Sequence, residues 1–151
     1  MYGYVSAVLS HKGRQVYTTS TTATVNEAVH LMNDKGVGAL LVLHEGRAVG
    51  IFTERDVLRR VVDPGRHPSV TRVAAVMTPD PLMVPPSTRV EEAMALMTER
   101  RFRHLPIMEN NEVIGIISIG DLMRIVSETQ RQEIQRMAEY ITGAEAIQPA
   151  T

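Results

Sequence analysis

The chain has 151 residues, and its sixteen basic and seventeen acidic side chains leave a formal net charge of −1. This balance argues against electrostatic capture of nucleic acid, and no apolar run approaches the ~20 residues needed to span a bilayer. The absence of cysteine excludes disulfides and thiolate metal sites. Since residues 1–16 also lack the pattern of a secretion signal, we expect a cytoplasmic protein.

An internal duplication organises the sequence. Shifted by 65 residues, Thr22–Val62 aligns without a gap on Ser87–Ser127 and gives eleven identical pairs in 41 positions. Most of these pairs are apolar residues, glycine or aspartate, which is more agreement than chance supplies. The chain is therefore predicted to hold two copies of one unit, residues 8–62 and 73–127, joined by a linker over residues 63–72.

The first copy reads as a helix, a hairpin and a second helix. Apolar residues at i, i+3, i+4 and i+7 predict an amphipathic helix over residues 25–32, with a capping box that starts at Thr24. Two short apolar runs around a turn predict a β-hairpin with strands over residues 40–43 and 48–52. The second helix is expected to begin near Thr53.

The second copy repeats this order. The same spacing predicts a helix over residues 90–97, with a candidate capping box at Thr88. The hairpin strands are expected over residues 105–108 and 113–117, and the next helix begins near Ser118.

A further helix is predicted beyond the duplication, over residues 128–143, followed by a tail over residues 144–151. Gly143 is placed where a glycine commonly stops a helix. Its apolar stripe, which includes Ile134 and Ile141, either packs back onto the two units or meets a second copy of the chain.

The strand-to-helix junctions carry the candidate chemistry. Gly50–Asp56 and Gly115–Asp121 both read glycine, two apolar residues, threonine or serine, two variable residues and aspartate. At a helix start the hydroxyl lies near unpaired backbone N–H groups that favour a phosphate, and the aspartate can accept two hydrogen bonds from a ribose. The alternative is that each motif is a capping box that needs no ligand.

Together with Val76-Met77-Thr78-Pro79 and Arg103-His104-Leu105-Pro106-Ile107, these motifs resemble those of the cystathionine-β-synthase (CBS) domain pair, or Bateman module. The resemblance covers about residues 8–127. It implies an α/β (α+β) fold in which tandem β-α-β-β-α repeats pack about a pseudo-two-fold axis, leaving two clefts for adenosine-containing ligands.

The resemblance also implies roles for individual residues. Asp56 and Asp121 would hold the ribose, and Thr53 and Ser118 would support the ribose or the phosphate. The adenine would lie between the first strand and the start of the second strand of each unit. The residues of these segments are Val16, Thr18, Thr19, Val37 and Ala39 in the first unit, and Leu82, Val84, Phe102, Arg103 and His104 in the second.

The two copies differ in their charged residues. Arg55 and Arg103-His104 have no charged counterpart in the other copy, and our hypothesis is that they bind phosphate, arginine by its planar fork and histidine by a proton available at neutral pH. The alternative is that Arg103 belongs, with Arg100 and Arg101, to a solvated cluster at a helix end. We expect the two sites to be unequal.

These observations favour a free-standing regulatory sensor over an enzyme. The expected ligand is AMP, ADP or ATP, with NAD(H) and S-adenosylmethionine as further candidates, and no catalytic cofactor, metal, nucleic acid or membrane is expected to take part. The output would pass to a separate effector protein, and the chain would form a disc-like homodimer. The alternative function is a ligand-independent dimerisation or scaffold module.

Overall fold

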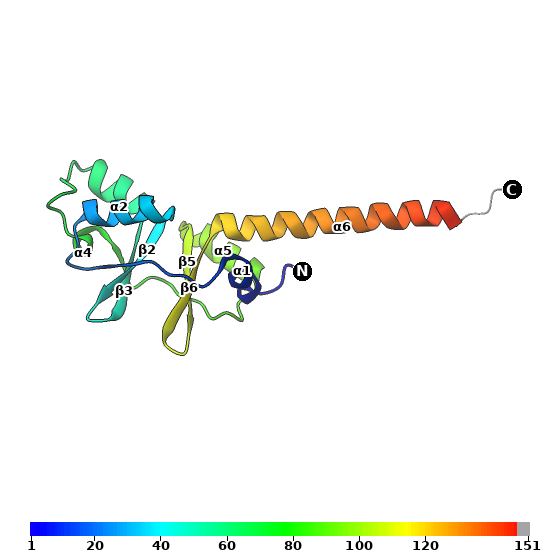
Figure 1. Ribbon diagram of the computed structural model, residues 1–151, viewed down its shortest axis with the longest axis horizontal. Helices are drawn as coiled ribbons and strands as arrows, with labels where there is room; N and C mark the ends of the chain where they lie inside the picture. The colour runs from blue at the N-terminus through cyan, green and yellow to red at the C-terminus, as the bar shows by residue number, and fades with distance from the viewer. Residues whose placement is uncertain (148–151) are drawn as a thin grey trace.

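The computed structural model describes residues 1–147, with side chains described as far as Gly143. It forms two small α+β units side by side, from which one long helix projects (Figure 1). The elements in chain order are α1 (Val5–Lys12), β1 (Thr18–Ser20), α2 (Val25–Lys35), β2 (Ala39–His44), β3 (Arg47–Thr53), α3 (Glu54–Asp56), the π-helical turns η1 (Val57–Val62), α4 (Val73–Val76), β4 (Thr78–Pro79), α5 (Val90–Arg100), β5 (His104–Glu109), β6 (Glu112–Ser118) and α6 (Ile119–Ile147).

Both predicted hairpins are present, and the turns explain their tight closure. Strands β2 and β3 pair antiparallel, as do β5 and β6, with an irregularity at the same place in each. The two turn residues of each hairpin have positive φ, 50° and 78° at Glu45 and Gly46 and 52° and 63° at Asn110 and Asn111. This is the backbone geometry of two-residue hairpin turns, which asparagine and glycine adopt most readily.

The sheets of the two units differ in size. The first sheet has the order β1-β2-β3-β4, with β1 parallel to β2, and the short β4 comes from the segment that leads into the second unit. In the second unit the predicted strand over residues 82–84 is reduced to a single parallel bridge between Val84 and Ile107. In the first unit the Leu41 N–H donates to the Tyr17 carbonyl at 3.0 Å. The duplicate of Leu41 is Pro106, which has no N–H to donate, so the strand cannot extend.

The helix starts also differ between the copies. Thr24 caps α2 by accepting a hydrogen bond from the Glu27 N–H at 3.2 Å, which is one half of the predicted capping box. The Glu27 carboxylate accepts from the Thr24 hydroxyl instead of its N–H. The predicted capping box at Thr88 is wrong, because α5 begins after Arg89 and has no side-chain cap. Its expected partner Glu91 instead accepts a hydrogen bond from the Tyr2 N–H at 2.9 Å.

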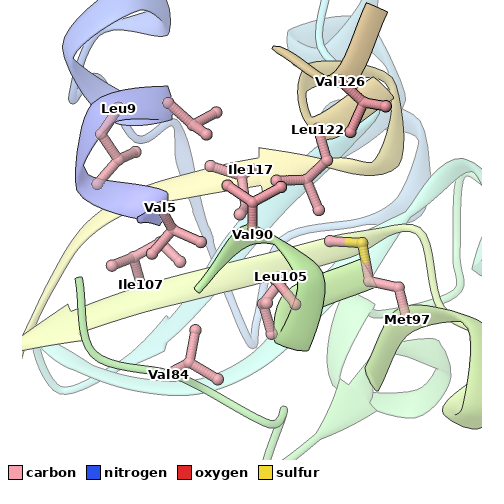
Figure 2. Packing of buried hydrophobic residues seen from close by; sticks show 12 residues of the cluster. Val5, Leu9, Val84, Val90, Met97, Leu105, Ile107, Ile117, Leu122 and Val126 are labelled. Atoms are coloured by element: carbon pink, nitrogen blue, oxygen red, sulfur yellow. The ribbon is translucent and has the colours of Figure 1, made fainter. Parts of the chain in front are cut away.

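Helix α1 was not anticipated from the sequence, and it crosses to the second unit. Val5, Val8 and Leu9 are at most 2% exposed and pack in one cluster with β5, β6, α5 and the start of α6 (Figure 2). The motif glycine of the second unit makes this approach possible, since a Cβ on Gly115 would lie 2.5 Å from a Leu9 methyl group. The N-terminal helix thus completes the core of the second unit.

A separate apolar cluster joins the two units. It brings Ala39 and Leu41 of β2 and Ile51 of β3 against Ile116 of β6, all at most 9% exposed. The hairpins therefore face each other across this cluster, which confirms the predicted tandem packing of two α+β repeats.

The last helix is longer than predicted. Helix α6 runs without interruption from Ile119 to Ile147, so Gly143 does not end it, and the predicted separate helix over 128–143 is the continuation of the second unit's own helix. Its C-terminal part projects away from both units (Figure 1). Ile134, Met137 and Ile141 are 69%, 66% and 57% exposed, so the stripe does not pack back onto the pair. Within residues 1–147, no helix combines the length and apolarity needed to cross a membrane.

Candidate functional site

The motif of the first unit forms a complete capping box. The Thr53 hydroxyl accepts a hydrogen bond from the Asp56 N–H at 3.3 Å, and Asp56 Oδ2 accepts from the Thr53 N–H at 3.0 Å and from its hydroxyl at 3.2 Å. Asp56 Oδ1 accepts from the Thr78 hydroxyl at 3.2 Å, and the Arg60 Nε lies 3.7 Å away. With these partners Asp56 is only 6% exposed.

The motif of the second unit is capped in the same way but carries a different outside partner. Asp121 Oδ2 accepts from the Ser118 N–H at 2.7 Å, while the Ser118 hydroxyl accepts from the Asp121 N–H at 3.1 Å. The Lys12 ammonium, at the end of α1, donates to Asp121 Oδ2 at 2.7 Å and to the Ile116 carbonyl at 2.6 Å. Burial by itself raises the pKa of Asp121, but the Lys12 and Ser118 donors outweigh it, so the pKa lies below its usual value.

The first motif opens on a cavity of about 600 Å³ that both units build. We call it the Asp56 cavity. The first unit contributes the end of β3, α3 and η1, and the second contributes the end of α5, the start of β5 and the segment after β4. Its lining residues are Ile51, Thr53, Glu54, Arg55, Asp56, Leu58, Arg59, Arg60, Thr78, Pro81, Leu82, Arg100, Arg101, Phe102, Arg103 and His104.

Positive charge dominates this lining, because six arginines face only two carboxylates, Glu54 and Asp56. Two of the arginines are fixed by backbone carbonyls. Arg55 Nη1 donates to the Arg101 carbonyl at 2.7 Å, across the two units, and Arg60 Nη1 donates to the Met77 carbonyl at 2.7 Å. A cavity that is walled by fixed guanidinium groups suits a ligand with several negative charges.

His104 lies in the wall of this cavity but is not a cation at neutral pH. Burial, together with the nearby Lys12 and Arg103 cations, lowers the pKa of His104 from 6.5 to about 4, although Asp121 acts in the opposite sense. The expectation that its proton is available at neutral pH is therefore wrong for the protein without ligand. A bound phosphate would favour the protonated form, since an opposite charge raises the pKa of a histidine.

The pocket beside the second motif is much smaller. The pocket beside Asp121 measures about 50 Å³ and is lined by Val8, His11, Lys12, Asp121, Arg124, Ile125 and Glu128. We call it the Asp121 cleft. Asp121, Arg124 and Ile125 are the duplicates of the cavity residues Asp56, Arg59 and Arg60. The two clefts that the resemblance implies are therefore one large cavity and one small cleft.

The structure brings about half of the residues proposed from the sequence into the Asp56 cavity. Those that line it are Thr53, Arg55, Asp56, Leu82, Phe102, Arg103 and His104. The ribose motif of the first unit thus faces the adenine segment of the second. Val84 and Ala39 are each 7% exposed and belong to apolar clusters, against which Val16 and Val37 also pack. Thr18, Thr19 and Ser118 line neither of the two pockets.

Sequence reasoning missed the outside partners of both aspartates. Thr78 comes from the start of the second unit and donates to the first motif, whereas Lys12 comes from the start of the first unit and donates to the second. Thr78 carried a signal, because it lies in the Val76–Pro79 motif. Lys12 carried none, since its contact with Asp121 spans 109 positions of the sequence.

Comparison with known proteins gives the same family for both units. The family model "CBS domain" matches residues 5–63 and 73–128. Among curated proteins, the CBS domain-containing protein CBSX3, mitochondrial, of Arabidopsis thaliana is 39% identical over 148 residues, which cover 92% of this chain and 72% of the relative. The CBS domain-containing protein YhcV of Bacillus subtilis is 36% identical over 118 residues, 78% of this chain and 84% of the relative.

Solved structures agree with the sequence relatives. A putative signal-transduction protein with CBS domains from Burkholderia ambifaria is 44% identical, with a TM-score of 0.78 over 82% of this chain and 93% of its own. The hexameric CBS-CP12 protein from bloom-forming cyanobacteria is 28% identical, with a TM-score of 0.75 over 96% of this chain and 90% of its own. This chain, with its duplicated motifs and paired α+β units, belongs to the CBS-domain family.

Proposed function

We propose that the chain is a regulatory binding protein and that the Asp56 cavity binds an adenine nucleotide. The observation that carries the proposal is the cavity itself. Its volume of about 600 Å³ lies in the range of small-molecule sites, and it combines an arginine-rich wall with apolar and aromatic surface from Leu82 and Phe102. A ligand with a flat apolar ring at one end and phosphates at the other matches this division.

The charge of the wall favours nucleotides with more than one phosphate. Two carboxylates against six arginines leave an excess of four positive charges. ADP and ATP are therefore expected to bind more tightly than AMP. NAD(H), whose diphosphate carries no more negative charge than AMP, is expected to bind no more tightly than AMP, and the cationic S-adenosylmethionine ranks last.

Ribose binding by Asp56 requires an exchange of hydrogen bonds. The ionised carboxylate offers about four acceptor positions, and Thr53 and Thr78 occupy three of them. A ribose hydroxyl can take the place of the Thr78 hydroxyl on Oδ1 without disturbing the capping bonds, which use Oδ2. Asp56 would then complete the capping box of α3 and bind ligand at the same time.

A thermal-shift series with AMP, ADP and ATP tests the proposal. Each nucleotide that binds should raise the melting temperature, since a ligand at 100 times its Kd stabilises the fold by about 2.7 kcal/mol. Native mass spectrometry of freshly purified protein should show a retained nucleotide mass. If no adenine nucleotide shifts the melting temperature at millimolar concentration, the proposed binding function is wrong.

A ligand-independent scaffold is the second candidate, and one observation favours it. Both aspartates already have full capping partners within the protein, so the motifs are accounted for without a ligand. Asp56→Asn separates the two functions, because it retains the side-chain shape and an acceptor oxygen for the Thr53 N–H but replaces the other oxygen by a donor. Lost thermal shift with a folded apoprotein supports nucleotide binding, whereas a scaffold shows no shift to lose.

The output is proposed to pass to a separate effector protein through a homo-oligomer, in a cytoplasmic setting that suits the cysteine-free sequence. Leu58 and its duplicate Met123 are 63% and 46% exposed on equivalent helices, and Ile134, Met137 and Ile141 extend the apolar surface along α6. A disc-like homodimer would cover these side chains. Ile134→Glu should shift the sedimentation profile towards monomer, and an unchanged profile would remove α6 from the interface.

A further inference from the structure

The Lys12 side chain occupies the position at Asp121 where a ligand would be held. Its ammonium donates to Asp121 Oδ2 at 2.7 Å and to the Ile116 carbonyl at 2.6 Å, which is the pattern that donors of a bound ligand would make. The Asp121 side chain is only 12% exposed and that of Lys12 is 34% exposed. Two short, charge-assisted hydrogen bonds in a partly buried place hold this cation firmly.

The helix that carries Lys12 is anchored by buried side chains. Val5, Val8 and Leu9 anchor α1 in the core of the second unit and are at most 2% exposed. Lys12 is the last residue of that helix, and Gly13 follows with a φ of 96°. Opening the Asp121 cleft therefore requires only that the long side chain swing away, while α1 stays in place.

The equivalent position in the first unit shows what the cleft is like without this cation. The duplicate of Lys12 is Met77. The Met77 sulfur lies so close to Gly50 that a Cβ there would be 2.5 Å from it. The Met77 side chain therefore turns into the first unit rather than towards Asp56. Asp56 is held from outside by the neutral Thr78 hydroxyl, and the space beside it measures about 600 Å³, against about 50 Å³ beside Asp121.

We infer that Lys12 is a built-in occupant of the Asp121 cleft and the residue that limits the chain to one nucleotide site. This rests on the proposed function and adds a specificity determinant to it. The ammonium competes with the ribose hydroxyls of a ligand for the same carboxylate oxygen. A nucleoside that binds the second cleft has to displace it, whereas in the first cavity the Arg60 Nε stays 3.7 Å from Asp56 Oδ1, beyond hydrogen-bond distance.

Calorimetric titration of Lys12→Met with AMP tests the inference. Methionine keeps an unbranched apolar side chain but removes the competing cation. The wild type is expected to show a single binding event, and Lys12→Met is expected to show two. If the wild type does show a weak second event, that event should become at least about tenfold tighter in Lys12→Met, which corresponds to about 1.4 kcal/mol. Lys12→Arg keeps the charge and should retain the single event. Arg14→Met, which removes an exposed cation two residues later, is the matched control.

Two outcomes would overturn the inference. If Lys12→Met binds AMP as the wild type does, Lys12 does not block the cleft. If it binds less AMP while Arg14→Met does not, Lys12 is a ligand contact rather than a competitor. Far-UV circular dichroism and thermal melting of each variant establish that it is folded.

A measurement without ligand separates this inference from the proposed function. Lys12 is one of the cations that lower the pKa of His104, so the His104 pKa followed by NMR should rise in Lys12→Met and stay low in Arg14→Met. If the His104 pKa rises in Lys12→Met but neither the wild type nor Lys12→Met binds AMP, Lys12 lies in the cleft and the proposed nucleotide binding is wrong. An unchanged pKa places the ammonium elsewhere and rejects the inference itself.

Discussion

The Asp56 cavity and the Asp121 cleft are built on the same sequence motif, but their charged groups differ. Each aspartate closes a capping box, and each accepts one more hydrogen bond from a residue at the start of the other unit. That donor is a neutral hydroxyl at Asp56 and an ammonium at Asp121. Asp56 has only a longer contact with a cation, the Arg60 Nε at 3.7 Å, whereas the Lys12 ammonium bonds Asp121 directly at 2.7 Å. The duplication therefore retained the backbone geometry and changed the electrostatics.

The arginines follow the same division. Of the six in the Asp56 cavity, only Arg59 and Arg100 have a basic duplicate, in Arg124 and Lys35. The remaining duplicates are Gly120 for Arg55, Ile125 for Arg60, Gly36 for Arg101 and Gly38 for Arg103. At Gly38 even a Cβ would meet His104 Nε2 at 3.1 Å and the Glu54 carboxylate at 3.3 Å. The first unit therefore has no room for an arginine where the second unit carries Arg103.

The largest expected effect comes from His104, whose duplicate is Ala39. The pKa of His104 is lowered from 6.5 to about 4 in the folded protein. Between these pH values His104 binds a proton in the unfolded chain but not in the folded one. Stability should fall by up to about 3 kcal/mol as the pH drops from about 6.5 to 4, and this loss should be absent in His104→Gln. Urea unfolding at several pH values measures it, and an equal loss in the variant contradicts the assignment.

The next largest effect is expected on nucleotide binding when Arg103 is replaced. Arg103→Ala removes a charged donor from the cavity wall and is expected to weaken ATP binding by about 2 kcal/mol, roughly thirtyfold. Arg124→Ala removes a cation from the Asp121 cleft and should leave the affinity unchanged. Isothermal calorimetry compares the two, and equal losses would mean that ATP binds elsewhere than in the Asp56 cavity.

Removing the capping carboxylate should cost less. Asp56→Ala leaves the Thr53 N–H without its acceptor and is expected to lower the free energy of unfolding by about 1.5 kcal/mol. Asp121→Ala should cost more than Asp56→Ala, because it also leaves the Lys12 ammonium unpaired in a partly buried position. Denaturant unfolding without nucleotide gives both values, and the reverse order would show that the Lys12 contact adds nothing to stability.

The smallest effect is expected at Thr78. Thr78→Val deletes the neutral donor to Asp56 Oδ1 and should lower the free energy of unfolding by about 1 kcal/mol or less. Because a ribose hydroxyl can take the vacated position, AMP affinity should be retained or slightly raised. A large loss of affinity would make Thr78 a direct ligand contact instead.

Local patterns were sufficient for much of the fold. The spacing of apolar residues around Val25 and Val90 places the two amphipathic helices, and the turn residues place both hairpins, because these features depend on neighbours a few positions apart. The duplication itself made the paired fold predictable. The same local reasoning failed at Thr88 and Gly143, where the choice between two plausible helix ends depends on contacts elsewhere in the chain.

By itself, the sequence determined that two equivalent motifs exist, that each places an aspartate at a helix start, and that Arg55, Arg103 and His104 make the copies unequal. Only the tertiary structure decided that Thr53 and Asp56 share a cavity with Phe102 and His104 of the other unit, and that Lys12 reaches Asp121. The physical reason is that α1 and β4 cross between the units. Such contacts join residues that are far apart in the chain, and no periodicity or motif spacing encodes them.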